Sequence, residues 1–121
     1  MIKELGILYR LPHLDRAHFR DYYERHHVPL IVKLLPTISR YVRNYVESDS
    51  FSNSGSAPVS WDALTEIWFE TPAAHEAFLT AISNSDVIRV IRKDEENFID
   101  SKRSQRILVQ ESVTPDAMLQ A

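Results

Sequence analysis

Hydrophobic and polar positions recur with two different periods along the chain, and the changes of period outline its elements. A period of 2 over residues 2–11 predicts a strand that Pro12 ends. From Arg16 onward the period becomes about 3.6, which predicts a helix with one apolar face. Pro29 stands inside this pattern and is expected to kink the helix or to end its first part, ahead of a second piece that reaches Pro36. The apolar face is formed by Phe19, Tyr22, Tyr23, His26, His27 and Leu30.

Strand and helix patterns return in the rest of the chain. Residues 38–46 and 61–69 alternate and predict two strands, separated by a Ser-rich surface loop at 47–60. The remaining predicted elements are a helix from Pro72, a second helix after a break at residues 83–86, and a last strand at 105–113.

The resulting order, β-α-β-β-α-β, predicts an α+β fold. It is typical of a ferredoxin-like subunit, in which helices cover one face of a four-stranded antiparallel sheet. Because several strands carry apolar or aromatic side chains on both faces, the other face needs a cover. We expect a second copy to cover it, in a homodimer with twofold symmetry. We also expect one domain at residues 1–112, including the loop at 47–60, and a C-terminal tail at 113–121 that frays.

Composition and charge narrow the chemistry. The 121 residues include no Cys and only 2 Gly, which excludes thiol nucleophiles, Cys-bound metal clusters and Gly-rich nucleotide cradles. A net charge of −3 without a basic cluster argues against nucleic acid as a partner. Neither a membrane span nor a signal peptide is apparent, so we expect a cytoplasmic protein. The residue types that remain suit proton transfer, with a small-molecule substrate and no cofactor or metal.

His27 is the leading candidate for a catalytic residue. It shares the apolar helical face with Phe19 and Tyr23, so it should point at the sheet, where an imidazole can act as a base or acid near neutral pH. The backbone carbonyls freed near Pro29 would orient its ring. The alternative is a core histidine whose hydrogen bonds are satisfied locally. His26 lies at the edge of the same face, and adjacent helical residues diverge by about 100°, so the pair cannot chelate one metal ion.

Two carboxylates near the end of a predicted helix are candidates for an orienting group. Asp94 and Glu95 follow Ile91 by one helical turn and precede Phe98. We expect at least one of them to face inward, where it would orient a histidine and raise its basicity. The alternative is that residues 93–96 form a solvated charged run.

Predicted strands supply a second group of polar and aromatic candidates. These side chains would bind a planar anionic or phenolic molecule, or would form a salt bridge beneath a partner subunit, which is the interpretation we favour. The residues are Tyr41, Arg43 and Tyr45 on one strand and Glu66 and Trp68 on its neighbour.

Two segments resemble the motifs of EthD-like proteins, a family of the dimeric α/β-barrel superfamily. The stretch FRDYYERHHVPLI (residues 19–31) is similar to the first motif, and KDEENFID (93–100) is similar to the second. The run at 61–78 also fits, and the resemblance extends over about residues 2–112. The motif histidine corresponds to His27 alone, and the loop at 47–60 is not part of the pattern. The resemblance implies a ferredoxin-like subunit that dimerises through its sheet. Related barrels include cofactor-free isomerases, lyases and oxygenases.

The leading hypothesis is a cofactor-independent isomerase or lyase acting on a small aromatic, lactone or polyketide-type carbonyl compound. The reaction would be a proton transfer, a dehydration or a decarboxylation. His27 would move a proton next to the carbonyl, oriented by Asp94 or Glu95. Tyr23, Tyr45 or Arg43 would hold the developing enolate oxygen. The alternatives are a non-catalytic ligand-binding or accessory protein of a degradation or biosynthetic pathway, and a haem-binding barrel. The expected catalytic residues are His27, Asp94 and Tyr23, and the expected substrate-binding residues are His26, Tyr41, Arg43, Tyr45, Glu66, Trp68, Glu95 and Phe98.

Overall fold

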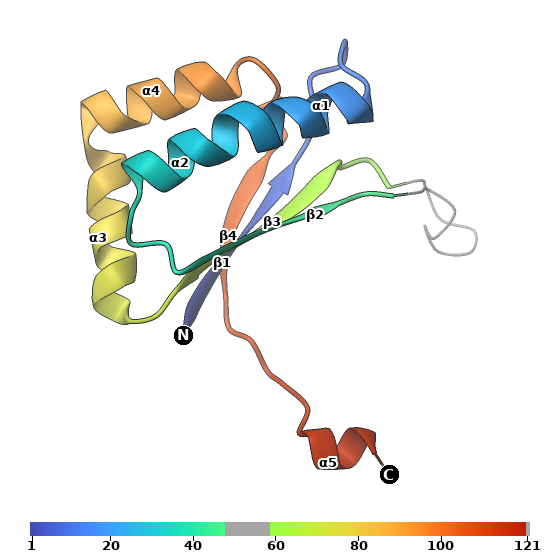
Figure 1. The fold of residues 1–121 in the computed structure, drawn as a ribbon, viewed down its shortest axis with the longest axis vertical. Helices are drawn as coiled ribbons and strands as arrows, with labels where there is room; N and C mark the ends of the chain where they lie inside the picture. Colours follow the sequence, from blue (N-terminus) through green and yellow to red (C-terminus); the bar gives the residue numbers. More distant parts are fainter. Residues whose placement is uncertain (48–58, 121) are drawn as a thin grey trace.

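The computed structural model describes residues 1–47 and 59–120, so most of the predicted loop at 47–60 lies outside the described residues. Four antiparallel strands form one sheet in the order β2-β3-β1-β4 (Figure 1). The strands are β1 (Ile2–Leu8), β2 (Arg40–Tyr45), β3 (Ala63–Phe69) and β4 (Gln105–Val109). The helices are α1 (Arg16–Tyr22), a π-helical segment η1 (Tyr23–His27), α2 (Val28–Leu34), α3 (Pro72–Ser83), α4 (Ser85–Glu95) and α5 (Asp116–Leu119).

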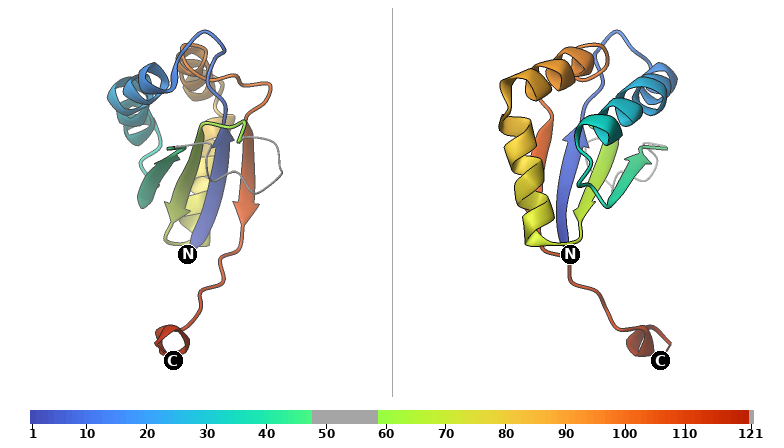
Figure 2. Two further views of the ribbon diagram at one scale, coloured as in Figure 1. Left: turned by 90° about the vertical axis from the view of Figure 1, so that its right-hand side faces the viewer. Right: turned by 60° about the vertical axis from the view of Figure 1, so that its left-hand side comes forward.

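The main helices, from α1 to α4, lie on one face of the sheet, as the two views of Figure 2 show. Asp15 caps α1, Thr71 caps α3 and Asn84 caps α4, each by accepting hydrogen bonds from first-turn N–H groups. The predicted ferredoxin-like α+β subunit is therefore confirmed. The first and last strands are shorter than predicted: residues 9–11 and 110–113 lie outside the strands.

The helical segment around Pro29 is neither broken nor ended by that residue. Pro29 has no N–H to donate to the carbonyl four residues earlier, so one regular helical hydrogen bond is missing at the start of α2. The turn before it widens into η1, where the N–H of Val28 bonds the carbonyl of Tyr23. This wide turn directs both Tyr23 and His27 inward, where they are 2% and 4% exposed.

The middle of strand β1 reverses the usual placement of polar and apolar residues, although Ile2 and Leu8 at its ends pack on the helix side. Its pairing with β3 places Glu4 and Gly6 beneath the helices, and leaves Leu5 and Ile7 on the open face. Burial of Glu4 is compensated by contacts of its carboxylate with His75 at 2.6 Å and Arg106 at 2.9 Å. Gly6 adds no side chain, so space remains between the sheet and the helices above it.

Aromatic rings dominate the core between sheet and helices. One cluster centres on Phe98, which is 0% exposed and contacts Phe19, Tyr23 and His27. A second cluster, nearer α3, contains Ile31, Leu35, Phe69, Phe78 and Ile91. The two clusters hold the helices over the sheet on either side of the space above Gly6.

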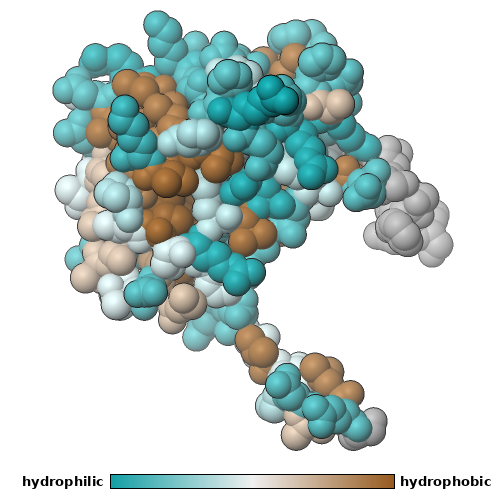
Figure 3. Space-filling model, in the orientation of Figure 1, coloured by the Kyte–Doolittle hydropathy of each residue, from teal (hydrophilic) through white to brown (hydrophobic). Residues whose placement is uncertain are grey.

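Some hydrophobic surface lies outside this core. Figure 3 shows hydrophobic surface where α2, α3 and α4 come together and on the tail that projects from the body. Val113, Met118 and Leu119 of the tail are mostly exposed. None of the helices in residues 1–47 and 59–120 is long and apolar enough to span a membrane.

Replacing the most central ring should destabilise the fold. We expect Phe98→Ala to lower the free energy of unfolding by about 3–5 kcal/mol, because it leaves a cavity among packed rings. Urea denaturation at a fixed protein concentration measures this change. Leu119→Ala, at a side chain that is 72% exposed, is the control and should be nearly neutral. A similar cost for the two variants would contradict the packing described here.

Candidate active site

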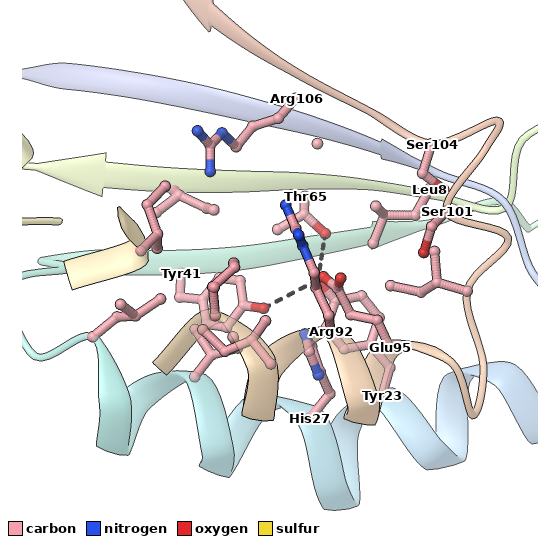
Figure 4. A pocket seen from close by; sticks show the side chains of 18 of the residues that line it. Leu8, Tyr23, His27, Tyr41, Thr65, Arg92, Glu95, Ser101, Ser104 and Arg106 are labelled. Carbon is pink, nitrogen blue, oxygen red and sulfur yellow. Dashed lines mark hydrogen bonds between the residues drawn. The ribbon is translucent and has the colours of Figure 1, made fainter. Parts of the chain in front are cut away.

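A cavity of about 400 Å³ lies between the sheet and the helices (Figure 4). This is within the range of small-molecule sites, roughly 300–1,000 Å³. Its exposed lining residues come from α4, from the segment before β4 and from the start of β4, so the cavity opens between α4 and this part of the chain. The apolar lining comprises Leu8, Ile31, Leu35, Ile67, Phe78, Ile82, Ile88, Ile91 and Ile99, and the polar lining includes Tyr23, His27, Tyr41, Thr65, Arg92, Glu95, Ser101, Ser104 and Arg106.

His27 reaches this cavity from the π-helical turn. Its Nδ1 lies 2.8 Å from Oδ2 of Asp94, on α4. An ionised carboxylate only accepts hydrogen bonds, so Nδ1 carries the proton and donates it to Asp94. Within the described residues, nothing hydrogen-bonds Nε2, whose lone pair is therefore available to a molecule in the cavity. The expectation that carbonyls near Pro29 orient the ring is wrong, because η1 and α2 run on continuously and Asp94 takes that place.

Asp94 is itself held in position by a short chain of hydrogen bonds. The hydroxyl of Tyr22 donates to Oδ1 of Asp94 at 2.6 Å, and the amide of Asn97 donates to that hydroxyl at 2.8 Å. Both carboxylate oxygens of Asp94 therefore have a partner: Oδ2 has the imidazole of His27, and Oδ1 has the hydroxyl of Tyr22. This arrangement fixes the tautomer and the orientation of His27.

Burial sets the protonation state of the imidazole. It lowers the pKa of His27 below its usual value, while the hydrogen bond and charge of Asp94 oppose the shift. The ring is consequently neutral near pH 7, which is the form that can accept a proton. The pKa of Tyr22 is raised by burial and by its bond to Asp94, so its hydroxyl remains a donor.

Three hydroxyl groups form a chain on the sheet side of the cavity. The hydroxyl of Tyr23 lies 2.8 Å from that of Thr65 and 3.1 Å from that of Tyr41 (Figure 4). Burial raises the pKa of both phenols, so the chain keeps all three of its protons. Two protons satisfy the two bonds within the chain, and the third is available to an oxygen atom of a ligand.

Glu95 also lines the cavity, from the last residue of α4. Burial raises the pKa of its carboxyl group, and the neighbouring charge of Arg92 opposes that shift. Among the described residues, none hydrogen-bonds its carboxylate. The two adjacent carboxylates therefore differ in environment: Asp94 is fully bonded behind His27, and Glu95 faces the cavity.

Two of the predicted substrate-binding residues face the helices but lie outside the cavity lining. Arg43 donates two hydrogen bonds to the carboxylate of Glu24, at 2.9 and 3.0 Å, and the hydroxyl of Tyr45 donates to the same carboxylate. These bonds lower the pKa of Glu24, in the first place through Arg43. This cluster ties η1 to β2 beside the hydroxyl chain.

Glu66 and Trp68 lie on the opposite, open face of the sheet. There Glu66 contacts Lys3 at 3.4 Å and accepts a hydrogen bond from Asn44 at 2.9 Å. The expectation that Glu66 and Arg43 would act together is wrong, because Arg43 pairs with Thr65 and so projects to the helix side.

The remaining two predicted residues differ in burial. His26 is exposed and packs its ring on Tyr22, with centroids 4.7 Å apart, away from the cavity. Phe98 packs against the His27 ring, with centroids 4.9 Å apart, and so supports it from the core side. The structure thus brings together Tyr23, His27, Tyr41 and Glu95 at the cavity, with Asp94 and Phe98 behind them.

Sequence reasoning missed several polar residues at this site. In the sequence, Thr65 and Tyr22 are only members of periodic patterns. Nothing there indicates that Thr65 bonds Tyr23 or that Tyr22 bonds Asp94. Arg92, Ser101 and Arg106 come from exposed positions with no local signal at all. Within the described part of the chain, no cluster of three His, Asp or Glu side chains is arranged to hold a metal ion.

The fold and the buried His–Asp pair define a ferredoxin-like α+β protein with a small-molecule-sized cavity. The EthD domain family model matches residues 11–102, and the chain belongs to this family. No curated protein sequence matches at a significant level.

Solved structures share the fold. An ethyl tert-butyl ether D (EthD) family protein from Bacillus halodurans is 21% identical, with a TM-score of 0.63 over 93% of this chain and 100% of that one. An EthD-like protein from Ralstonia eutropha is 21% identical, with a TM-score of 0.59 over 93% of each chain. SnoaB, a cofactor-independent oxygenase from Streptomyces nogalater, is 13% identical, with a TM-score of 0.59 over 93% of this chain and 94% of its own.

Removing the charge of Asp94 should change the titration of His27. Because that carboxylate raises the pKa of His27 against the effect of burial, Asp94→Asn should lower this pKa further. Proton NMR of the imidazole as a function of pH measures the shift. Asp86→Asn is the matched control, since Asp86 is an exposed residue of the same helix whose ion-pair contact is with Arg89. An unchanged or higher His27 pKa in Asp94→Asn would contradict the pairing.

Proposed function

We propose that this protein is a cofactor-independent isomerase or lyase that moves a proton next to the carbonyl group of a small aromatic, lactone or polyketide-type compound. The observation that carries the proposal is the His27–Asp94 pair. It presents a neutral imidazole with an open Nε2 to a mostly apolar cavity. A base oriented in this way is pre-arranged for general base catalysis.

The first step is removal of a proton from the carbon next to the carbonyl. Nε2 of His27 accepts this proton, and the positive charge that forms on the ring is stabilised by Asp94 through Nδ1. The electron pair of the broken C–H bond moves onto the carbonyl oxygen. The imidazolium can then return the proton at another carbon, which completes an isomerisation.

The developing enolate oxygen needs a hydrogen-bond donor. The hydroxyl chain of Tyr23, Tyr41 and Thr65 has one proton more than its internal bonds use. A donor aimed at developing charge in a buried site stabilises the transition state more than it would in water. We therefore assign these hydroxyls to the enolate oxygen, opposite the base.

The cavity supports a small and largely apolar substrate. Aliphatic side chains and Phe78 form its apolar walls, and the rings of Tyr23 and Phe98 flank His27 on the core side. A volume of about 400 Å³ suits a molecule of one or two rings. Among proteins of this fold, SnoaB is described as a cofactor-independent oxygenase, so the architecture accommodates catalysis without a cofactor in that protein.

Loss of the imidazole should abolish proton transfer. We expect wild-type protein to exchange the α-protons of benzylacetone for deuterium in heavy water, and His27→Ala to do so about 10²–10⁴-fold more slowly. Exchange should also fall as the pH decreases through the lowered pKa of His27, because protonation removes the base. Proton NMR follows the loss of the α-proton signals.

The matched control is His18→Ala, which removes an exposed histidine of α1 that bonds Asp15. It should exchange at the wild-type rate. Full exchange activity in His27→Ala would contradict the proposed role. Thermal stabilisation of the wild type by benzylacetone without any exchange would instead support a ligand-binding accessory protein.

We also propose that the functional unit is a homodimer formed through the open face of the sheet. The helices leave this face bare, and β1 presents Leu5 and Ile7 there. Leu64 and Ile107 lie on the same face, opposite Ile7 and Leu5 respectively. A contiguous apolar strip of this kind is typical of an interface.

A charge in the middle of this strip should separate the subunits. We expect Ile107→Asp to shift the mass measured by light scattering from twice 14.0 kDa toward a single chain. Val90→Asp places the same charge at an exposed apolar position on the helix side and should remain dimeric. A monomeric wild type would contradict the proposed interface.

A further inference from the structure

Glu95 is a carboxyl group in the cavity that the proton transfer described above leaves unused. Successive helical residues diverge by about 100°, so Asp94 meets Nδ1 of His27 while Glu95 lines the cavity itself. Figure 4 shows His27 and Glu95 both entering from the helix layer, with Tyr41 and Thr65 on the sheet side. The imidazole of His27 and the carboxyl group of Glu95 therefore face one ligand-sized space.

The surroundings of Glu95 favour a neutral carboxyl group. Burial raises its pKa, and the charge of Asp94 adds to this effect, while Arg92 and Arg106 oppose it. Glu95 is also the last residue of α4, where the helix end disfavours a negative charge. Glu95 is part-buried, and within the described residues its carboxyl group has no hydrogen-bond partner, so a proton or a bond to a ligand in the cavity would stabilise it. The group is therefore suited to donate a proton into the cavity.

We propose that Glu95 is a second catalytic residue, which protonates a departing hydroxyl group, so that the site dehydrates a β-hydroxy carbonyl compound. This inference rests on the proposed function of His27. Nε2 of His27 takes a proton from the α-carbon, and the C–H electron pair becomes the double bond between the α- and β-carbons. The C–O bond at the β-carbon breaks with its pair on oxygen, and the proton of Glu95 converts the leaving group into water.

The products are an α,β-unsaturated carbonyl compound, a water molecule, a protonated His27 and an ionised Glu95. One proton lost from His27 to solvent and one gained by Glu95 restore the starting state, so the cycle consumes no other reactant. Both exchanges have a route, because the cavity opens beside Arg92 and Arg106, which are exposed.

The division of labour between Glu95 and the hydroxyl chain follows from acidity. An enolate oxygen needs only a hydrogen bond, which the phenols supply, and the raised pKa of Tyr23 and Tyr41 makes them poor donors of a whole proton. A departing hydroxide needs full protonation, and a carboxyl group is the stronger acid. An isomerisation needs one shuttling base, whereas a dehydration needs a base and an acid, and the cavity contains both.

Two matched probes separate the role of Glu95 from that of His27. Benzylacetone reports α-proton exchange, which needs the base, and β-hydroxybenzylacetone reports dehydration to benzalacetone, which needs the acid as well. We expect wild-type protein to act on both. Glu95→Gln should lower the ratio of the dehydration rate to the exchange rate by about 10²-fold. Deuterium incorporation by NMR and the ultraviolet absorbance of benzalacetone give the two rates.

Glu96→Gln is the control, since Glu96 is the exposed neighbour of Glu95 and should leave both rates unchanged. Residual exchange in Glu95→Gln shows at the same time that the variant is folded around the cavity. A wild type that exchanges benzylacetone but does not dehydrate the hydroxy probe would overturn the role of Glu95 and leave the proposed function intact, and so would an unchanged ratio in Glu95→Gln. A wild type no faster than His27→Ala on either probe would overturn both.

Discussion

The buried hydrogen bond between His27 and Asp94 is the interaction on which the site depends. It joins two helical segments that are 67 residues apart in sequence, across a core made of aromatic rings. Burying an imidazole and a carboxylate is unfavourable unless each is bonded, and here each partner satisfies the other. Tyr22 bonds the other oxygen of Asp94 and is itself bonded by Asn97, so within residues 1–47 and 59–120 Nε2 of His27 is left without a partner and is available to the cavity.

The position of His27 is set by the backbone before it is set by any side chain. Pro29 prevents a regular hydrogen bond one turn earlier, and the helix responds with one wide π-helical turn. That turn brings Tyr23 and His27 to the same side, one in the hydroxyl chain and the other as the base. The base and one of the three proposed oxyanion hydroxyls, that of Tyr23, are thereby held by one element, which favours a fixed geometry between them.

Sequence periodicity predicted the order of strands and helices, and with it the fold. It could do so because apolar residues recur with a different period in strands and in helices. It also predicted that His27 turns inward and that at least one of Asp94 and Glu95 does. It failed for contacts between strands, where Arg43 and Glu66 lie on opposite faces, because alternation within a strand does not give the register between strands. It could not separate Asp94 from Glu95 either. Which of the two carboxylates meets His27 depends on how α4 packs against η1, and this tertiary arrangement cannot be read from the periodicity of either segment.

Strand β1 connects the cavity to the open face. An ordinary half-buried strand would direct its apolar residues at the helices, and Leu5 and Ile7 would then occupy the space above the sheet. Instead Gly6 adds no side chain there and the Glu4 carboxylate is in ion-pair contact with His75 and Arg106, while Leu5 and Ile7 project outward. The alternation that opens the cavity is the same alternation that leaves an apolar strip on the far face. Because successive side chains of a strand point to opposite faces, the register that places Glu4 and Gly6 on the cavity side also places Leu5 and Ile7 on the open face.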